Sequence, residues 1–99
     1  MMTCMAEENT KEEDIRFVEK RTQPTTPEAE CYIGCILDAL GLLDDGELIP
    51  RNCRKFSQNV VAKEKYCLKL YEKCHRSVGS GNDRCITGPL LWKCMISLN

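Results

Sequence analysis

The chain has 99 residues and a net charge of -1, with 14 lysines and arginines against 15 aspartates and glutamates. This balance provides no general electrostatic attraction for nucleic acid or for an anionic membrane, so neither is an expected partner. No apolar run approaches the length of a transmembrane helix, which argues against membrane insertion. A chain of this length is expected to form a single domain, 1–99, with a core that is marginal without crosslinks.

Eight cysteines provide candidates for those crosslinks. An even number of cysteines at this density in a small chain indicates a disulfide framework and an oxidising, extracellular compartment. Metal binding is the competing explanation, but no Cys-x-x-Cys occurs and the chain has one histidine, His75. The usual zinc spacings are therefore missing, and we expect disulfides with neither a metal nor another cofactor. Residues 1–10 are too polar for a signal peptide, so we expect a mature form whose leader has been removed.

The first part of the chain has two helix signals and one loop signal. Residues 1–8 carry Cys4 in a segment that can be helical. Thr10 and Glu13 have the spacing of a capping box and predict a helix over residues 11–20, with Phe17 among its apolar positions. Two prolines within residues 22–27 then predict a loop.

The strongest helix signal covers residues 26–40. Thr26 can cap this helix, Pro27 suits its first position and Gly41 can end it. Cys31 and Cys35 are one turn apart and share a face, so each is better placed to clamp another segment than to bridge its neighbour.

The second half is also helical in pattern. Residues 42–48 predict a tight turn rich in Asp and Gly, and Pro50 can open a short helix that runs through residue 56. Residues 60–78 have helical periodicity and carry Cys67 and Cys74 two turns apart. Asp83 can cap a last helix through residue 98, which Gly88-Pro89 must kink or delay. The predicted fold class is all-α, with five or six short helices.

Six of the cysteines follow a recognisable order, Cys4-x26-Cys31-x3-Cys35-x38-Cys74-x10-Cys85-x8-Cys94. The residues between them add to the pattern, in particular Tyr-Ile-Gly between Cys31 and Cys35, the turn Leu-Leu-Asp-Asp-Gly-Glu-Leu at residues 42–48, and Asn-Asp-Arg before Cys85. From Cys4 to Cys94 the chain resembles the insect odorant-binding proteins, the general-odorant and pheromone-binding family.

This resemblance implies a fold and a set of disulfides. The family has six helices around an apolar cavity, and its pairing order implies the bonds Cys4–Cys35, Cys31–Cys85 and Cys74–Cys94. The two cysteines outside the six-cysteine pattern, Cys53 and Cys67, are inferred to pair with each other. Five residues follow Cys94, so release of a ligand by a long C-terminal tail is not expected.

The resemblance also implies a function, that of a secreted carrier for a small hydrophobic molecule such as an odorant or a pheromone. Further partners compatible with it are a second copy of the chain, as a homodimer, and an olfactory receptor. The sequence contains neither a nucleophile-elbow motif nor an unpaired cysteine, so an enzyme is not expected. The candidate ligand-binding residues are the larger apolar side chains of the predicted helices and turn: Phe17, Ile36, Leu40, Leu43, Leu48, Phe56, Val61, Leu68, Tyr71, Leu91, Trp92 and Met95.

Two other functions remain open on the residues alone. One resembles the salivary D7-type proteins of blood-feeding insects, which bind amines or lipid mediators, with Asp38 as the carboxylate for an amine. The other is a secreted, disulfide-rich effector without a cavity, which would carry an exposed apolar patch. His75 can act as a pH sensor, although a histidine between Lys73 and Arg76 is more typical of a solvated surface.

Overall fold

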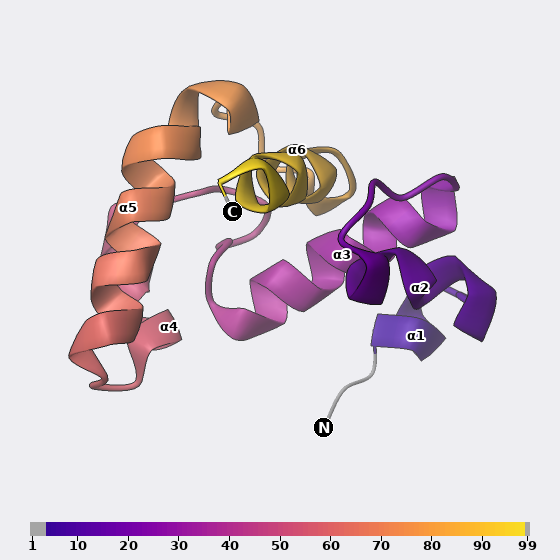
Figure 1. Cartoon of the computed structure of the whole chain (residues 1–99), viewed down its shortest axis with the longest axis horizontal. Coiled ribbons are helices and arrows are strands. Elements are labelled where there is room, and N and C mark those ends of the chain that lie inside the picture. The colour runs from indigo at the N-terminus through magenta and orange to yellow at the C-terminus, as the bar shows by residue number, and fades with distance from the viewer. Residues whose placement is uncertain (1–3, 99) are drawn as a thin grey trace.

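Helices make up nearly all of the regular structure in the computed structural model, which describes residues 4–98 (Figure 1). No β-strand occurs within these residues, so the all-α prediction is confirmed. The predicted first segment lies partly outside them, because residues 1–3 are not described. In chain order the elements are α1 (Cys4–Glu7), α2 (Glu12–Lys20), α3 (Pro27–Leu40), the 3-10 turn η1 (Pro50–Asn52), α4 (Cys53–Ser57), α5 (Val61–Val78) and α6 (Arg84–Ser97).

Helix α3 begins and ends where local chemistry predicts. The hydroxyl of Thr26 accepts a hydrogen bond from the backbone N–H of Ala29 at 3.0 Å, and Pro27 occupies the first helical position. Gly41 ends the helix at a φ of +90°, a conformation that glycine adopts without the steric cost a side chain would add. These are short-range interactions, which explains why the sequence predicts them.

The predicted capping box of α2 is wrong by one residue. Lys11 is the N-cap, and its backbone N–H donates to the carboxylate of Asp14 at 2.9 Å. Thr10 instead bonds back to the preceding helix, because both its backbone N–H and its hydroxyl donate to the carbonyl of Met5. The hydroxyl is therefore used to end α1, and the acidic residue next to Glu13 supplies the cap.

The turn after α3 is tight, as predicted, and it rests on the start of α6. Asp44 and Glu47 exchange backbone hydrogen bonds of 2.8 and 2.9 Å, while Asp45 and Gly46 have positive φ angles. The buried hydroxyl of Thr87 donates to the Gly46 carbonyl. A side chain at position 46 would come within 2.6 Å of the backbone of Asn82, so the turn packs directly on the residues that lead into α6.

Helix α6 is one continuous element from Arg84 to Ser97, with Pro89 inside it. Asp83 caps it, as predicted, by accepting a hydrogen bond from the N–H of Cys85 at 3.0 Å. The delay considered for Gly88-Pro89 does not occur. A proline costs a helix one hydrogen bond, and here the packing of α6 against α3 holds the helix together across that position.

Helices α3 and α6 cross near the middle of the molecule (Figure 1). Two glycines lie where their backbones meet. A Cβ atom added to Gly34 would overlap the carbonyl of Arg84, and one added to Gly88 would overlap the backbone of Gly34. The two backbones are therefore in direct contact. Only glycine at both positions permits this approach.

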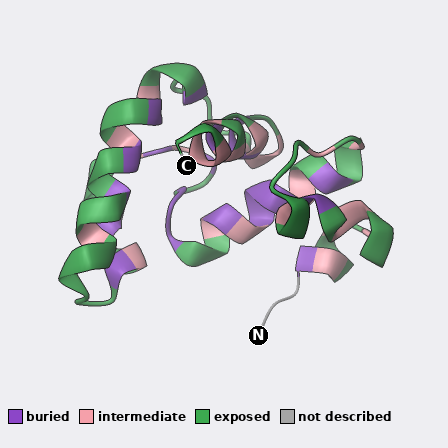
Figure 2. Ribbon diagram, in the orientation of Figure 1, coloured by how far each residue is buried: buried purple, intermediate pink, exposed green. Residues whose placement is uncertain are grey.

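The other helices are arranged around this crossing. Helices α1 and α2 pack against α3, whereas α4 packs against α5 and α5 packs against α6. Figure 2 shows buried positions along α3 and on the inner edge of α5, with the outer face of α5 exposed. The core includes Ile33 and Leu37 of α3, Leu70 of α5 and Leu91 of α6, each at most 2% exposed. Within residues 4–98, none of the helices has the length and apolarity needed to cross a bilayer.

Candidate ligand-binding site

All eight cysteines are paired, which fixes how the helices are joined. The four bonds are Cys4–Cys35, Cys31–Cys85, Cys53–Cys67 and Cys74–Cys94, with Cα–Cα distances of 5.7, 4.1, 5.4 and 5.9 Å. The three pairs implied by the resemblance and the inferred fourth pair are thus confirmed. Helix α3 is bonded to α1 and α6, and α5 is bonded to α4 and α6.

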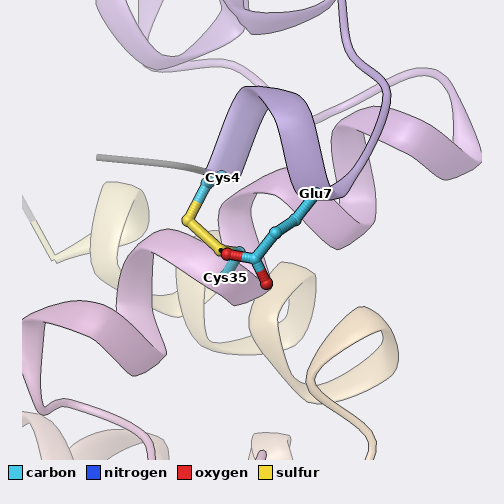
Figure 3. Close-up of side chains that lie close together, drawn as sticks. All are labelled: Cys4, Glu7 and Cys35. Carbon is cyan, nitrogen blue, oxygen red and sulfur yellow. Dashed lines mark hydrogen bonds between the residues drawn. A yellow bond between two sulfur atoms is a disulfide. The ribbon is translucent and has the colours of Figure 1, made fainter. Parts of the chain in front are cut away.

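Two groups of sulfur and carboxylate atoms lie close together beside α1. One consists of Cys4, Glu7 and Cys35, and Figure 3 shows the Glu7 carboxylate next to the disulfide of the two cysteines. The other consists of Glu8, Cys31 and Cys85. Cysteine binds a metal ion as the thiolate, and every sulfur in these groups is already bonded to another sulfur, so these cysteines are not available as ligands.

Arg84 explains why the two glutamates lie there. Its guanidinium is 3.3 Å from a Glu7 oxygen and 3.2 Å from a Glu8 oxygen. These ion pairs join the last residue of α1, and the residue that follows it, to the first residue of α6. Because all three side chains are partly exposed, each pair adds at most about 1 kcal/mol of stability.

The twelve predicted ligand-binding residues fall into three groups. The first is buried within the core and comprises Phe17, Leu43, Leu48 and Leu91. The second is partly buried and packs against that core, and comprises Ile36, Phe56, Tyr71, Trp92 and Met95. The third is exposed on the surface and comprises Leu40, Val61 and Leu68, at 52%, 64% and 45% of full exposure.

The second group is the most informative for ligand binding. Ile36, Phe56, Tyr71 and Met95 come from α3, α4, α5 and α6 respectively, and all four pack on one core cluster. Each of the four retains some accessible surface, so each lies between the buried core and solvent. We call these four side chains the four-helix apolar layer.

The exposure of Val61 and Leu68 has a simple geometric reason. Val61 and Leu68 are seven residues apart and share one face of α5. That face differs from the one that buries Cys67, Leu70 and Cys74. Helical spacing identifies which residues share a face, but the sequence does not say which face turns inward.

Trp92 is held in a fixed orientation by two contacts. Its indole N–H donates to the carbonyl of Thr22 at 2.7 Å, and its ring meets Phe17 edge-to-face at 5.9 Å. Such a pair contributes beyond its buried area. These contacts connect α6 to α2 and to the loop after α2. Trp92 is therefore part of the packing between these segments.

Several clefts open on the surface of the described residues, and two of them are relevant to ligand binding. The first, the α2–α3 cleft, has a volume of about 470 Å³ and is lined by Glu12, Ile15, Arg16, Val18, Glu19, Lys20 and Tyr32. The second, the α5 cleft, has a volume of about 390 Å³ and is lined by Glu47, Leu48, Tyr71, His75, Arg76, Gly79 and Ser80.

The α5 cleft is the one that meets the predicted site. It includes Leu48 and Tyr71 from the predicted set, and both belong to or pack against the core. The α2–α3 cleft includes none of the twelve, and its partly buried residues Val18 and Tyr32 lie outside that set. The sequence contains only a weak signal that these two residues lie together. Val18 follows Ile15 at helical spacing, and Tyr32 directly follows a cysteine.

Comparison with known proteins gives a consistent picture. The family model described as the PBP/GOBP family matches residues 1–97. General odorant-binding protein 69a of Drosophila melanogaster is 29% identical over 93 residues, which cover 85% of this chain and 55% of that protein. The chain thus spans about half the length of this relative.

Three solved structures are similar to the chain. Odorant Binding Protein 7 of Anopheles gambiae has four disulfide bridges and was solved with an azo compound. It is 26% identical to this chain with a TM-score of 0.75, and the match covers 97% of this chain and 76% of that one. The fatty acid binding protein OBP56a from the oral disk of the blowfly Phormia regina is 25% identical with a TM-score of 0.63, over 95% and 80%. The odorant-binding protein dmelOBP28a of Drosophila melanogaster, at 22% identity with a TM-score of 0.70 over 96% and 82%, shares the fold.

Proposed function

The chain belongs to the PBP/GOBP family, and from that premise we propose that it is an extracellular carrier of small hydrophobic ligands. The observation that supports this most directly is the four-helix apolar layer, Ile36, Phe56, Tyr71 and Met95. Side chains from four crosslinked helices turn toward one core and keep accessible apolar surface. A ligand lying on them would lose contact with water on several sides at once.

The size of the hydrophobic effect is sufficient for such a carrier. Each buried methylene contributes about 0.8 kcal/mol, so a ten-carbon chain gains roughly 8 kcal/mol before ordering costs. A free energy of that size corresponds to a dissociation constant near 1 μM before those costs. No charged anchor is required. Among the side chains that the structure describes, no buried nitrogen or oxygen lacks a hydrogen-bond partner.

The similar proteins are consistent with this proposal. One was solved with an azo compound and another is described as a fatty acid binding protein, and both ligand types have a large apolar part. Family and neighbours are binding proteins, so we propose a non-enzymatic role. The four disulfides fit an extracellular protein. The family match favours this function over the amine binder and the effector without a cavity.

The experiment is displacement of a fluorescent apolar probe from the oxidised protein by a panel of neutral volatiles, fatty acids and biogenic amines. We expect saturable displacement by the apolar compounds at micromolar concentration. Met95→Trp should weaken probe binding at least threefold, because it fills space in the four-helix apolar layer. Leu68→Trp is the matched control, since Leu68 is 45% exposed and outside that layer.

Circular dichroism of both variants shows whether they retain the helical fold. Absence of saturable probe binding by the wild-type protein would contradict the carrier function. Selective displacement by amines would favour the amine binder. The homodimer and the olfactory receptor stay predictions; analytical ultracentrifugation tests the first.

A further inference from the structure

We propose that the α5 cleft binds the hydroxyl group of a neutral, otherwise apolar ligand, with Nε2 of His75 as the hydrogen-bond acceptor. This inference rests on the proposed carrier function and narrows its ligand class to compounds such as long-chain alcohols. It follows from the orientation of one imidazole ring, from the apolar wall beside it and from the charges around it.

The orientation of the ring determines which nitrogen is available. Nδ1 of His75 lies 2.8 Å from the backbone carbonyl of Tyr71. A carbonyl oxygen only accepts hydrogen bonds, so Nδ1 carries the hydrogen and donates it. In the neutral imidazole Nε2 is then left with its lone pair, as an acceptor. Within the described residues no hydrogen-bond partner for Nε2 is present.

The ring itself is held in place by the side chain one turn earlier. The imidazole stacks on the ring of Tyr71, with centroids 4.8 Å apart and planes 12° from parallel. Two contacts therefore fix the imidazole of His75. Tyr71 makes both of them, one through its backbone carbonyl and one through its ring. A fixed acceptor loses little conformational freedom when a ligand binds, which favours affinity.

An apolar surface continues from the imidazole toward the core. Leu48 is 8% exposed and belongs to the core cluster, and Tyr71 packs against that cluster. Both residues line the α5 cleft together with His75. A ligand whose head group reaches Nε2 can therefore lay its hydrocarbon part against Leu48 and Tyr71, and Tyr71 also belongs to the four-helix apolar layer.

The charges around the cleft favour a neutral head group. Glu47 and Arg76 carry opposite charges and both line the cleft, so their net contribution is zero. Gly79 caps the C-terminus of α5, where the helix dipole is negative and disfavours a carboxylate. Because Glu47 and Arg76 cancel, these two side chains give an amine no net attraction either. A hydroxyl group needs no charged partner, and it supplies the hydrogen that Nε2 accepts.

The test compares two ligands with the same number of carbon and oxygen atoms, decanol and nonyl methyl ether, on the wild-type protein under the same conditions. Only the alcohol can donate a hydrogen bond. We expect the wild-type protein to bind decanol about threefold to tenfold more tightly than the ether, the range that one net hydrogen bond provides. His75→Phe should abolish this preference and keep the stacked ring. Arg76→Gln should preserve the preference.

A second measurement reads the site directly and needs no variant. The chain has a single histidine, so the imidazole nitrogen resonances in a ¹⁵N NMR spectrum belong to His75. We expect decanol to shift the Nε2 resonance and the ether to leave it in place. If both ligands bind equally and Nε2 does not shift, the hydroxyl site is wrong and the carrier function stands. If neither ligand binds, the carrier function for such ligands fails as well.

Discussion

Helix α6 contacts α3 on one side and α5 on the other, and the two junctions differ in kind. At α3 the contact is backbone to backbone through Gly34 and Gly88. At α5 the two helices are joined by the Cys74–Cys94 bond, and the partly buried side chains of Tyr71 and Met95 belong to the same two helices. The first junction leaves no room for an extra methyl group, whereas Tyr71 and Met95 are large side chains with several rotamers.

This difference separates the structural role of α6 from its proposed binding role. A contact between backbones cannot adapt to a ligand, because neither partner has a side chain to move. Side chains such as Met95 adapt more easily, since methionine is unbranched and flexible. We therefore expect the α3 junction to determine stability and the α5 side to accommodate ligands. The predictions below test that division, from the largest effect to the smallest.

Removal of the Cys31–Cys85 bond should have the largest effect. This bond joins residues 54 positions apart, and the chain-entropy model gives about 4 kcal/mol for a loop of that length. Cys31→Ser with Cys85→Ser should lower the free energy of unfolding by about that amount in urea denaturation. The double variant of Cys53 and Cys67 is the comparison: its separation is 14 and its expected cost is about 3 kcal/mol.

Disulfide mapping by mass spectrometry confirms that the remaining pairs are native in each variant. If the Cys53 and Cys67 variant lost more stability than the Cys31 and Cys85 variant, the α3 junction would not be the dominant constraint. If its melting temperature were unchanged, the fourth bond would contribute nothing.

One methyl group at the α3 junction should have the next largest effect. Gly34→Ala places a Cβ where the backbone of Arg84 lies, so the helices must separate. Overpacking of this kind costs about 3 kcal/mol, at the upper end of the usual range, because the obstacle is backbone. Gly81→Ala is the control, since its nearest new contact is an ordinary 3.7 Å to Thr87. Equal melting temperatures for the two variants would show that the junction is looser than the structure indicates.

A change of similar size on the α5 side should be tolerated. Met95→Leu keeps side-chain volume and lies in the partly buried layer, so we expect a loss of at most about 1 kcal/mol. Urea denaturation measures the stability, and probe displacement measures whether ligand affinity changes more than stability does. A loss as large as that for Gly34→Ala would remove the distinction between the two junctions.

The smallest effect is expected on the outer face of α5. Leu68→Ala removes a side chain that is already 45% exposed, so stability should change by less than about 0.5 kcal/mol. Thermal unfolding followed by circular dichroism is sufficient to detect a larger change. A marked loss would indicate that this face is covered in solution, for instance by a second copy of the chain.

The predictions that rest on neighbouring residues agree best with the structure. Thr26, Pro27 and Gly41 predict the limits of α3, and Asp83 predicts the start of α6, because caps act within one turn. The cap of α2 is the instructive exception. Thr10 has the right chemistry and spacing, but it bonds to Met5 of the previous helix, and the sequence pattern does not include that competing partner.

The sequence by itself determined the helical elements, the turn at residues 42–48 and, through the order of six cysteines, the family and its disulfide pairs. Only the tertiary structure decided which helix faces turn inward. In it, Leu40, Val61 and Leu68 lie on the surface. It also brought Gly34 against Gly88 and placed Leu48 beside His75 in one cleft. The physical reason is range: caps and turns depend on residues within one helical turn, whereas burial and clefts depend on contacts between segments far apart in the chain.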